Sequence, residues 1–371
     1  TITLENIDGT PGNIIPSGTS VFYYDLNPAT LEQAWCVQAE NYWILQNNQN
    51  LAFIYDGATS RRSAGFPFAH EVPPGNVMEY AMNRLAVALP AHRTFAIGDL
   101  VGSTSGTQAN QFRDAVLKFT QNNFLNSGRN FTVPQNAGGI TAMRSIPLLD
   151  EALGQGPLMV FTLTIAFTVQ LPTDATLWAE MESPIQTVSL ITNGSTSQNS
   201  TILVNGDVWY RSHDGWRSLV LARRDFNTWA NTPVSSEMNR VLSADEPTLL
   251  DFASACYFDG RMLMSVSPGR SAFGTFHRGR IALDLNRVSG LREKLPPAYD
   301  GLWTGLNVTQ VVSGLFNGKD RCFAFSVNYA GVLEFFEIHK KGEFDLLNSE
   351  KVRITSVLES FLMLGDTRQR G

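Results

Sequence analysis

The chain has 371 residues, of which 43% are hydrophobic, so it is long and apolar enough to bury a large core. Its formal net charge is −6, which lacks the basic excess of a nucleic-acid-binding surface, so we expect no sequence-specific nucleic-acid binding. No apolar stretch reaches the roughly 20 residues that cross a bilayer, so we expect no membrane span. Glycine (30 residues) and proline (17 residues) occur at ordinary frequencies, which excludes collagen-like and low-complexity classes.

Short β-type runs separated by Gly, Asn, Asp and Pro dominate the chain. The clearest hairpin joins 200–204 to 207–211 through Asn205-Gly206, a dipeptide that favours a type I′ turn. Asp214-Gly215 follows and leads into 216–221, which makes an antiparallel meander. In chain order, the other expected runs are 34–38, 42–46, 51–55, 82–88, 94–97, 139–143, 158–162, 165–169, 250–258, 262–266, 280–285, 311–316, 322–327 and 332–338.

These groups of strands begin about fifty residues apart, a period typical of propeller blades. We therefore predict an all-β fold, a β-propeller of about six four-stranded blades over residues 21–364. An extended segment (1–20) precedes the propeller, and a polar tail (365–371) follows it. The alternating run 353–364 is expected to be a strand that closes the ring, or alternatively a strand that belongs to a longer protein.

One segment departs from the β pattern and predicts an inserted helix at 108–125, within an insertion over 107–128. Phe112, Val116 and Phe119 share one face of that helix, which either docks a partner or packs on its own propeller. Together with Trp216 and Trp229, which we expect at subunit contacts, these three residues are the candidate contact surface.

Sequence signals for catalysis or ligand binding are weak. The chain has no GxSxG, HExxH or Walker motif, and its five histidines are not spaced as metal ligands. Its three cysteines, Cys36, Cys256 and Cys322, lack CxxC spacing and are predicted to be small buried apolar residues, which suits a reducing compartment. We therefore predict no catalytic residue, no cofactor and no metal.

A carbohydrate-active propeller is an alternative. Residues 212–216 (Ser-His-Asp-Gly-Trp) resemble the Asp-box of sialidase propellers, with one residue fewer between Asp and Gly. That box stabilises a turn and carries no catalysis. A sialidase would also need a tyrosine and several arginines in one cavity, and the candidates are Tyr210, Arg211, Arg217, Arg223 and Arg280.

The succession 139–143, 154–162 and 204–215 (Val-Asn-Gly-Asp-Val-Trp-Tyr-Arg-Ser-His-Asp-Gly) resembles propeller-bearing structural proteins of tailed bacteriophages. That class includes the nozzle and hub proteins of short tails, and 258–264 and 299–306 fit the same style. Nozzle proteins are usually much longer, so the chain is expected to be a fragment or a smaller virion component.

The resemblance implies a non-enzymatic structural component of a virion, in the tail or head–tail region. Its implied partners are other copies of itself and other virion proteins, and its implied location is the virion. A generic protein-interaction propeller is the remaining alternative.

Overall fold

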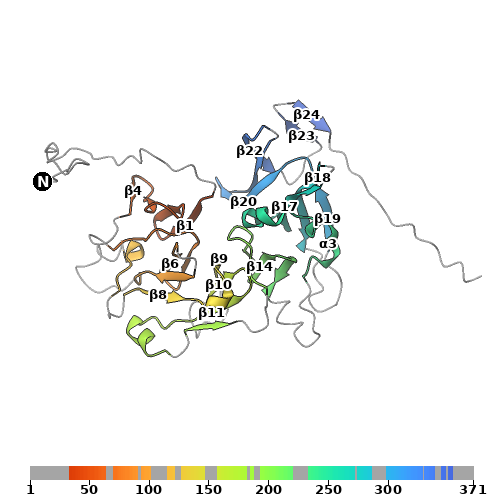
Figure 1. Cartoon of the computed structure of the whole chain (residues 1–371). Helices are drawn as coiled ribbons and strands as arrows, with labels where there is room; N and C mark the ends of the chain where they lie inside the picture. The colour runs from red at the N-terminus through yellow and green to blue at the C-terminus, as the bar shows by residue number, and fades with distance from the viewer. Residues whose placement is uncertain are drawn as a thin grey trace, which may run out of the picture.

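The computed structural model is an all-β structure whose strands are joined by turns and short helices (Figure 1). The described residues are 33–63, 70–90, 93–101, 115–121, 127–146, 157–181, 184–187, 193–219, 233–271, 274–285, 298–328, 330–338, 344–347 and 350–353. The expected N-terminal segment (1–20), the C-terminal tail (365–371) and the expected strand from 354 to 364 lie outside these ranges.

Consecutive strands pair antiparallel and form sheets that we number in chain order. The first sheet contains β1 (Trp35–Ala39), β2 (Tyr42–Gln46), β3 (Phe53–Tyr55) and β4 (Ser60–Arg62). The second contains β5 (Met78–Ala81), β6 (Arg84–Ala88), β7 (Thr94–Ile97) and β8 (Arg129–Thr132). The third contains β9 (Ile140–Ser145), β10 (Leu158–Thr162), β11 (Ala166–Val169) and β12 (Ile185–Thr187).

The second half of the chain continues in the same way. The fourth sheet contains β13 (Ile202–Val204), β14 (Asp207–Ser212) and β15 (Gly215–Ser218). The fifth contains β16 (Ala255–Phe258), β17 (Arg261–Ser271), β18 (Gly274–Asp284) and β19 (Ala298–Trp303). The sixth contains β20 (Val308–Phe316), β21 (Lys319–Val327) and β22 (Leu333–Ile338), and a hairpin of β23 (Phe344–Leu347) and β24 (Glu350–Arg353) follows.

The helices are short connectors between strands. Within the described residues they are η1 (Ala115–Leu117), η2 (Gln135–Ala137), η3 (Ala175–Ala179), η5 (Ser236–Met238), α3 (Asn239–Leu242) and η6 (Pro247–Phe252). Each is at most two turns long, so packing between sheets must supply the core.

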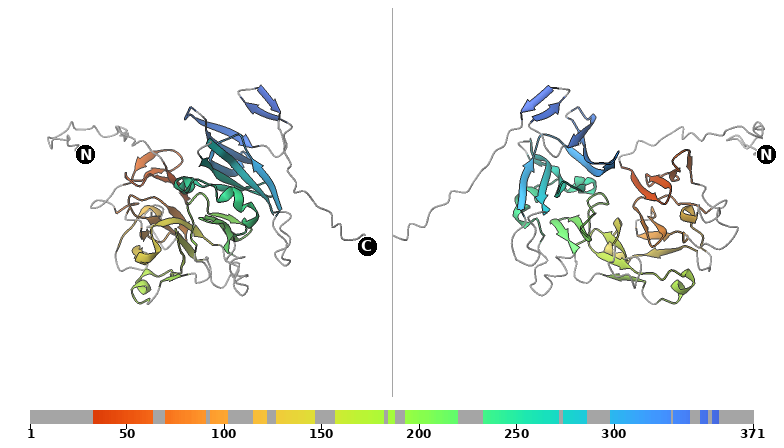
Figure 2. Two further views of the ribbon diagram at one scale, coloured as in Figure 1. Left: turned by 45° about the vertical axis from the view of Figure 1, so that its right-hand side comes forward. Right: turned by 180° about the vertical axis from the view of Figure 1, so that it is seen from behind.

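The core consists of apolar clusters, each shared by two sheets that follow one another in the chain. Phe95 of β7 and Val160 of β10, for example, share the cluster between the second and third sheets. The sheets accordingly follow one another around an arc that begins with β1–β4 and finishes with β20–β22, and its two ends turn toward each other (Figures 1 and 2). This confirms the predicted all-β class with several four-stranded antiparallel sheets, although the fourth and sixth sheets have three described strands, and the arrangement is consistent with a propeller-like fold. The number of blades stays a prediction.

The hairpin turns carry the local geometry that the sequence predicts. Asn205 (φ 51°) and Gly206 (φ 78°) are both left-handed, as a type I′ turn requires, and they join β13 to β14. Asp259-Gly260 and Asn317-Gly318 repeat this geometry. Met82 and Asn83 also have positive φ, so the expected run 82–88 is wrong at its start: these two residues form the turn and β6 begins at Arg84.

Replacing Gly206 by alanine should lower the free energy of unfolding by about 1–2 kcal/mol, because an L side chain is strained at positive φ. A Cβ at this position would meet no neighbouring atom, so the cost is purely conformational. Urea unfolding measures it, with Asn205→Gly as the control that should be close to neutral. An unchanged midpoint for Gly206→Ala would contradict the turn geometry.

Two expected elements are corrected by the structure. The strand expected at 250–258 begins only at Ala255, because η6 occupies the preceding residues. Pro247 opens that helix, where its fixed φ is favourable and its missing N–H costs nothing.

The helix expected at 108–125 is wrong in its described part. After η1, Lys118 forms a β-bridge with Glu71, and the Phe119 N–H donates to the His70 carbonyl at 2.7 Å. The segment at His70 and Glu71 therefore supplies the backbone hydrogen-bond partners that a helix would supply from its own residues. Residues 108–114 and 122–125 lie outside the described residues.

Candidate interaction surface

The residues predicted as a contact surface are buried where the structure describes them. Val116 is 0% exposed and Phe119 is 8% exposed, and both pack between the first and second sheets. Trp216 is 1% exposed and packs between the fourth and fifth sheets. The prediction is therefore wrong for these three, because large apolar side chains fill the spaces between sheets. Phe112 and Trp229 lie outside the described residues.

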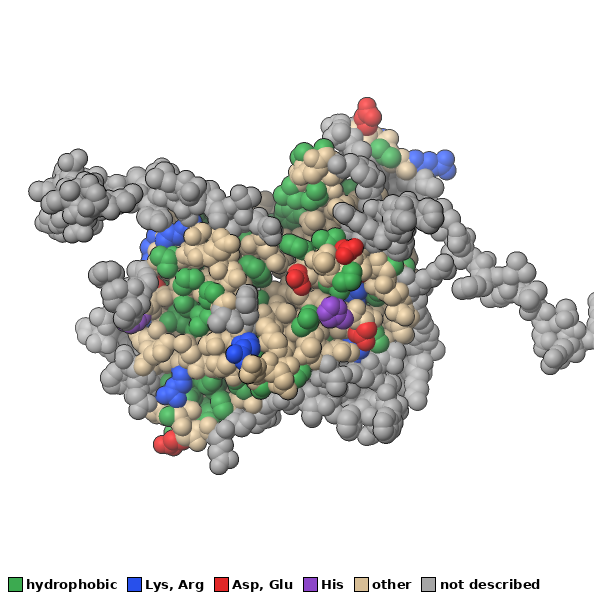
Figure 3. All heavy atoms as spheres, viewed as in Figure 1, with side chains coloured by type: hydrophobic (Ala, Val, Ile, Leu, Met, Phe, Trp, Pro, Cys, Tyr) green, Lys and Arg blue, Asp and Glu red, His purple; other side chains and the backbone are tan. Residues whose placement is uncertain are grey.

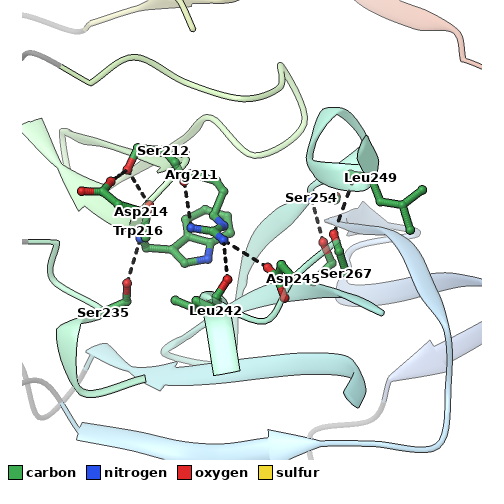
Figure 4. A network of polar contacts seen from close by, with 12 residues as sticks. Arg211, Ser212, Asp214, Trp216, Ser235, Leu242, Asp245, Leu249, Ser254 and Ser267 are labelled. Atoms are coloured by element: carbon green, nitrogen blue, oxygen red, sulfur yellow. Dashed lines mark hydrogen bonds and ion pairs between the residues drawn. The ribbon is translucent and has the colours of Figure 1, made fainter. Parts of the chain in front are cut away.

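The Asp-box-like segment is a turn that is tied together by its own side chains (Figure 4). The Ser212 hydroxyl donates to Asp214 Oδ1 at 2.6 Å, and Arg217 Nη2 donates to Asp214 Oδ2 at 2.5 Å. Burial opposes ionisation of Asp214, but the Ser212 hydrogen bond and the Arg217 ion pair outweigh it and lower the Asp214 pKa. The Trp216 N–H donates to Ser235 Oγ at 2.8 Å, which attaches residues 233–235 to the edge of β15.

The described residues that a sialidase-like site would need do not all come together, because only Tyr210 and Arg217 share a face of the fourth sheet. In the pairing of β14 with β15, Tyr210 lies opposite Arg217 and Arg211 lies opposite Trp216. Arg211 is therefore on the other face of the sheet from Tyr210 and Arg217. Arg280 lies in the fifth sheet with its guanidinium 4.8 Å from the centre of the Trp303 ring. Arg223 lies outside the described residues.

The described ranges hold neither a cluster of metal ligands nor a membrane-spanning helix. Three or more histidine, cysteine, aspartate or glutamate side chains do not come together there as metal ligands. In the same part of the chain, no helix combines the length and apolar character that crossing a membrane requires.

The sixth sheet has one buried and one exposed face, and both are apolar. On the buried face, Val311, Cys322 and Ala324 pack against the fifth sheet. Side chains alternate along a strand, so the neighbouring residues Val312, Phe323 and Phe325 point to the opposite face.

That opposite face carries a contiguous cluster of aromatic side chains. The Phe323 and Phe335 rings stack with centroids 4.9 Å apart. The centroid of the Phe316 ring lies 5.1 Å from that of Phe323, and the centroid of the Phe325 ring lies 5.0 Å from that of Phe335. Phe335 is 59% exposed, Leu333 is 62% exposed and Phe316 is 41% exposed. We call this set the terminal aromatic face; it consists of Phe316, Phe323, Phe325, Leu333 and Phe335. Figure 3 shows hydrophobic side chains gathered on the protruding region where Figure 1 labels β22.

An ion pair borders the terminal aromatic face. Arg321 donates to both carboxylate oxygens of Glu337, at 2.7 and 2.6 Å, and this hydrogen bonding raises the Arg321 pKa. The Arg321 guanidinium also lies 4.9 Å from the centre of the Phe323 ring. An aromatic centre with an arginine-containing polar border has the composition of a protein–protein interface.

The other end of the arc also exposes aromatic side chains. Trp43 and Tyr55 lie opposite each other on β2 and β3, and each is 39% exposed. The Trp43 ring packs edge-to-face on Phe53 with centroids 6.4 Å apart, and Arg62 lies 5.8 Å from the centre of the Phe53 ring. We call Trp43, Phe53 and Tyr55 the first-sheet face.

Sequence reasoning missed both faces. The β22 sequence has Leu333 and Phe335 on one side and Phe336 and Ile338 on the other, which is the pattern of a strand covered on both sides. The sequence of β22 therefore indicates two apolar faces, but only the position of the sixth sheet at the end of the arc shows that one of them is exposed.

No family model matches the chain, and no curated protein matches it. Among solved structures, the AfRom2 CNH domain is similar at 10% sequence identity, with a TM-score of 0.32. The match covers 83% of this chain and 94% of that domain. A TM-score at this level identifies neither a fold nor a function.

Proposed function

We propose that this chain is a non-enzymatic structural protein that assembles by packing its terminal aromatic face against the first-sheet face of a second copy. The observation that carries the proposal is the cluster of exposed aromatic side chains on β20–β22. Soluble proteins seldom leave large apolar patches exposed unless the patch binds something.

The pattern of the core indicates that the partner covering the terminal aromatic face is another sheet. Each apolar cluster in the interior lies between two successive sheets, so a sheet face is the partner that fits a sheet face throughout this molecule. The first-sheet face is also aromatic and exposed, and it lies at the other end of the arc. A contact of one end with the other is heterologous, and such contacts build rings or filaments.

The biological setting that we propose is a bacteriophage virion, in the tail or head–tail region, with other copies of the chain and other virion proteins as partners. The resemblance at 139–162 and 204–215 supports this setting, and the six successive sheets suit the predicted six blades. Mass spectrometry of purified virions tests it. Absence of the protein from the particles would overturn the proposed place in a virion. The assembly proposal is tested separately, by measuring self-association.

Replacing Phe335 by serine should weaken self-association by about tenfold or more, because central aromatic residues dominate interface energies. Light scattering after size-exclusion chromatography, over a range of concentrations, measures the association. Leu315→Ser is the matched control: Leu315 lies on β20 of the same sheet, is 75% exposed and is outside the terminal aromatic face, so its substitution should leave association unchanged.

Trp43→Ser should weaken the same association, because it alters the other half of the contact. Two outcomes would overturn the proposal. One is a parent chain that stays monomeric at every concentration, and the other is a Phe335→Ser variant that associates as the parent does.

A further inference from the structure

Two of the three cysteines lie side by side in the core. Cys256 is in β16 of the fifth sheet and Cys322 is in β21 of the sixth, 66 residues apart in sequence, and their sulfur atoms are 3.6 Å apart. Both are buried, at 6% and 0% exposure. Cys36, in the first sheet, is exposed and lies elsewhere.

We propose that Cys256 and Cys322 form a site of reversible oxidation, at which peroxide converts them into a disulfide that links the fifth sheet to the sixth. A disulfide needs a sulfur–sulfur distance of about 2.05 Å, so the two atoms must approach by about 1.5 Å. The cluster around them includes the small side chains Ala282 and Ala324.

The surroundings assign different roles to the two thiols. The hydrogen bond from the Cys256 thiol lowers the Cys322 pKa, burial and Asp320 oppose this, and the Arg280 guanidinium adds to the lowering. The same hydrogen bond, together with burial, raises the Cys256 pKa. These opposite shifts favour Cys322 over Cys256 as the thiolate.

The chemistry balances with hydrogen peroxide as the oxidant. The Cys322 thiol is oxidised to a sulfenic acid while one peroxide is reduced to water. The Cys256 sulfur then attacks the Cys322 sulfur, the S–S bond forms, and the hydroxyl leaves as a second water. A dithiol reductant reverses the step. The cysteine pair lies between the fifth and sixth sheets, on the opposite face of the sixth sheet from the terminal aromatic face, so its oxidation is independent of the assembly proposal.

Cys36→Ser provides the background for the test, because it removes the exposed thiol and leaves the buried pair. Treatment of this variant with hydrogen peroxide should remove two titratable thiols per chain. Peptide mapping without reduction should find a single cross-linked peptide that contains Cys256 and Cys322. The unfolding temperature should rise by about 5 °C and return to its starting value after dithiothreitol.

The control is the same background with Cys322→Ser, in which peroxide should produce neither the cross-linked peptide nor the rise in unfolding temperature. The mapping is also done on the unsubstituted chain, so the result does not depend on the variants folding. Recovery of Cys256 and Cys322 as free thiols, or as separately oxidised sulfinic acids, would overturn the inference.

Discussion

Replacing Asp245 by alanine is expected to lower the free energy of unfolding by about 3–5 kcal/mol, because it leaves a buried arginine without its counter-charge. The side chains of Arg211 and Asp245 are 1% and 3% exposed, and Arg211 Nη2 lies 3.1 Å from Asp245 Oδ2 (Figure 4). Arg211 also donates to the carbonyls of Ser212 and Leu242, at 2.8 and 3.3 Å. Those carbonyls solvate the guanidinium but do not neutralise it.

The measurement is denaturant unfolding of the single and double variants. Arg211→Met with Asp245→Leu should be less destabilised than Asp245→Ala, because the double variant buries no charge. Glu337→Ala is the surface control: it breaks the Arg321 pair, whose side chains are 37% and 28% exposed, and should cost less than about 1 kcal/mol. A similar small loss for Asp245→Ala would show that Arg211 reaches water when its partner is removed.

The local part of this fold is predictable from sequence because turn chemistry is local. Asn205-Gly206, Asp259-Gly260 and Asn317-Gly318 each determine a hairpin through positive φ, whatever lies around them. Runs such as 94–97 and 158–162 coincide with β7 and β10 because they are apolar strands bounded by turn residues. The start of 82–88 was missed because Met82-Asn83 is not a typical turn dipeptide.

The candidate site depends on long-range order, which single-sequence patterns do not carry. Trp216 and Phe335 are both large aromatic residues in strands, yet one is buried between two sheets and the other is exposed at the end of the arc. Nothing within a few residues of either distinguishes them. The proximity of Cys256 and Cys322 is equally invisible, because it depends on the register of β16 and β21 in two different sheets.

Residues 194–201 are the clearest case of tertiary structure overriding composition. This stretch of serine, threonine, asparagine and glutamine reads as a surface loop, yet Ser195, Ser200 and Thr201 are 0% exposed. It lies against β9, β14 and the start of β16, and it makes hydrogen bonds with backbone and side-chain groups there and within the stretch itself. Burial is tolerated because most of the polar groups find partners, with Thr196 Oγ1 as an exception.

Replacing Gln198 by alanine is expected to cost about 2–5 kcal/mol, because it removes two hydrogen bonds from one buried backbone position. The Met143 N–H donates to Gln198 Oε1 at 2.7 Å, and Gln198 Nε2 donates to the Met143 carbonyl at 3.0 Å. Met143 lies on β9, the edge strand of the third sheet, and is 0% exposed, so the amide side chain replaces a missing neighbouring strand. Truncation leaves both backbone groups without a partner and without water.

Gln46 offers the matched control. Its side chain is also buried, at 2% exposure, and it makes a single hydrogen bond, from Nε2 to the Pro73 carbonyl at 2.9 Å. Gln46→Ala therefore leaves one buried acceptor without a partner, whereas Gln198→Ala leaves a donor and an acceptor without partners. Calorimetric or urea unfolding should find that Gln198→Ala lowers the free energy of unfolding about twice as much as Gln46→Ala does. Equal costs would mean that water reaches the Met143 backbone once the Gln198 amide is gone.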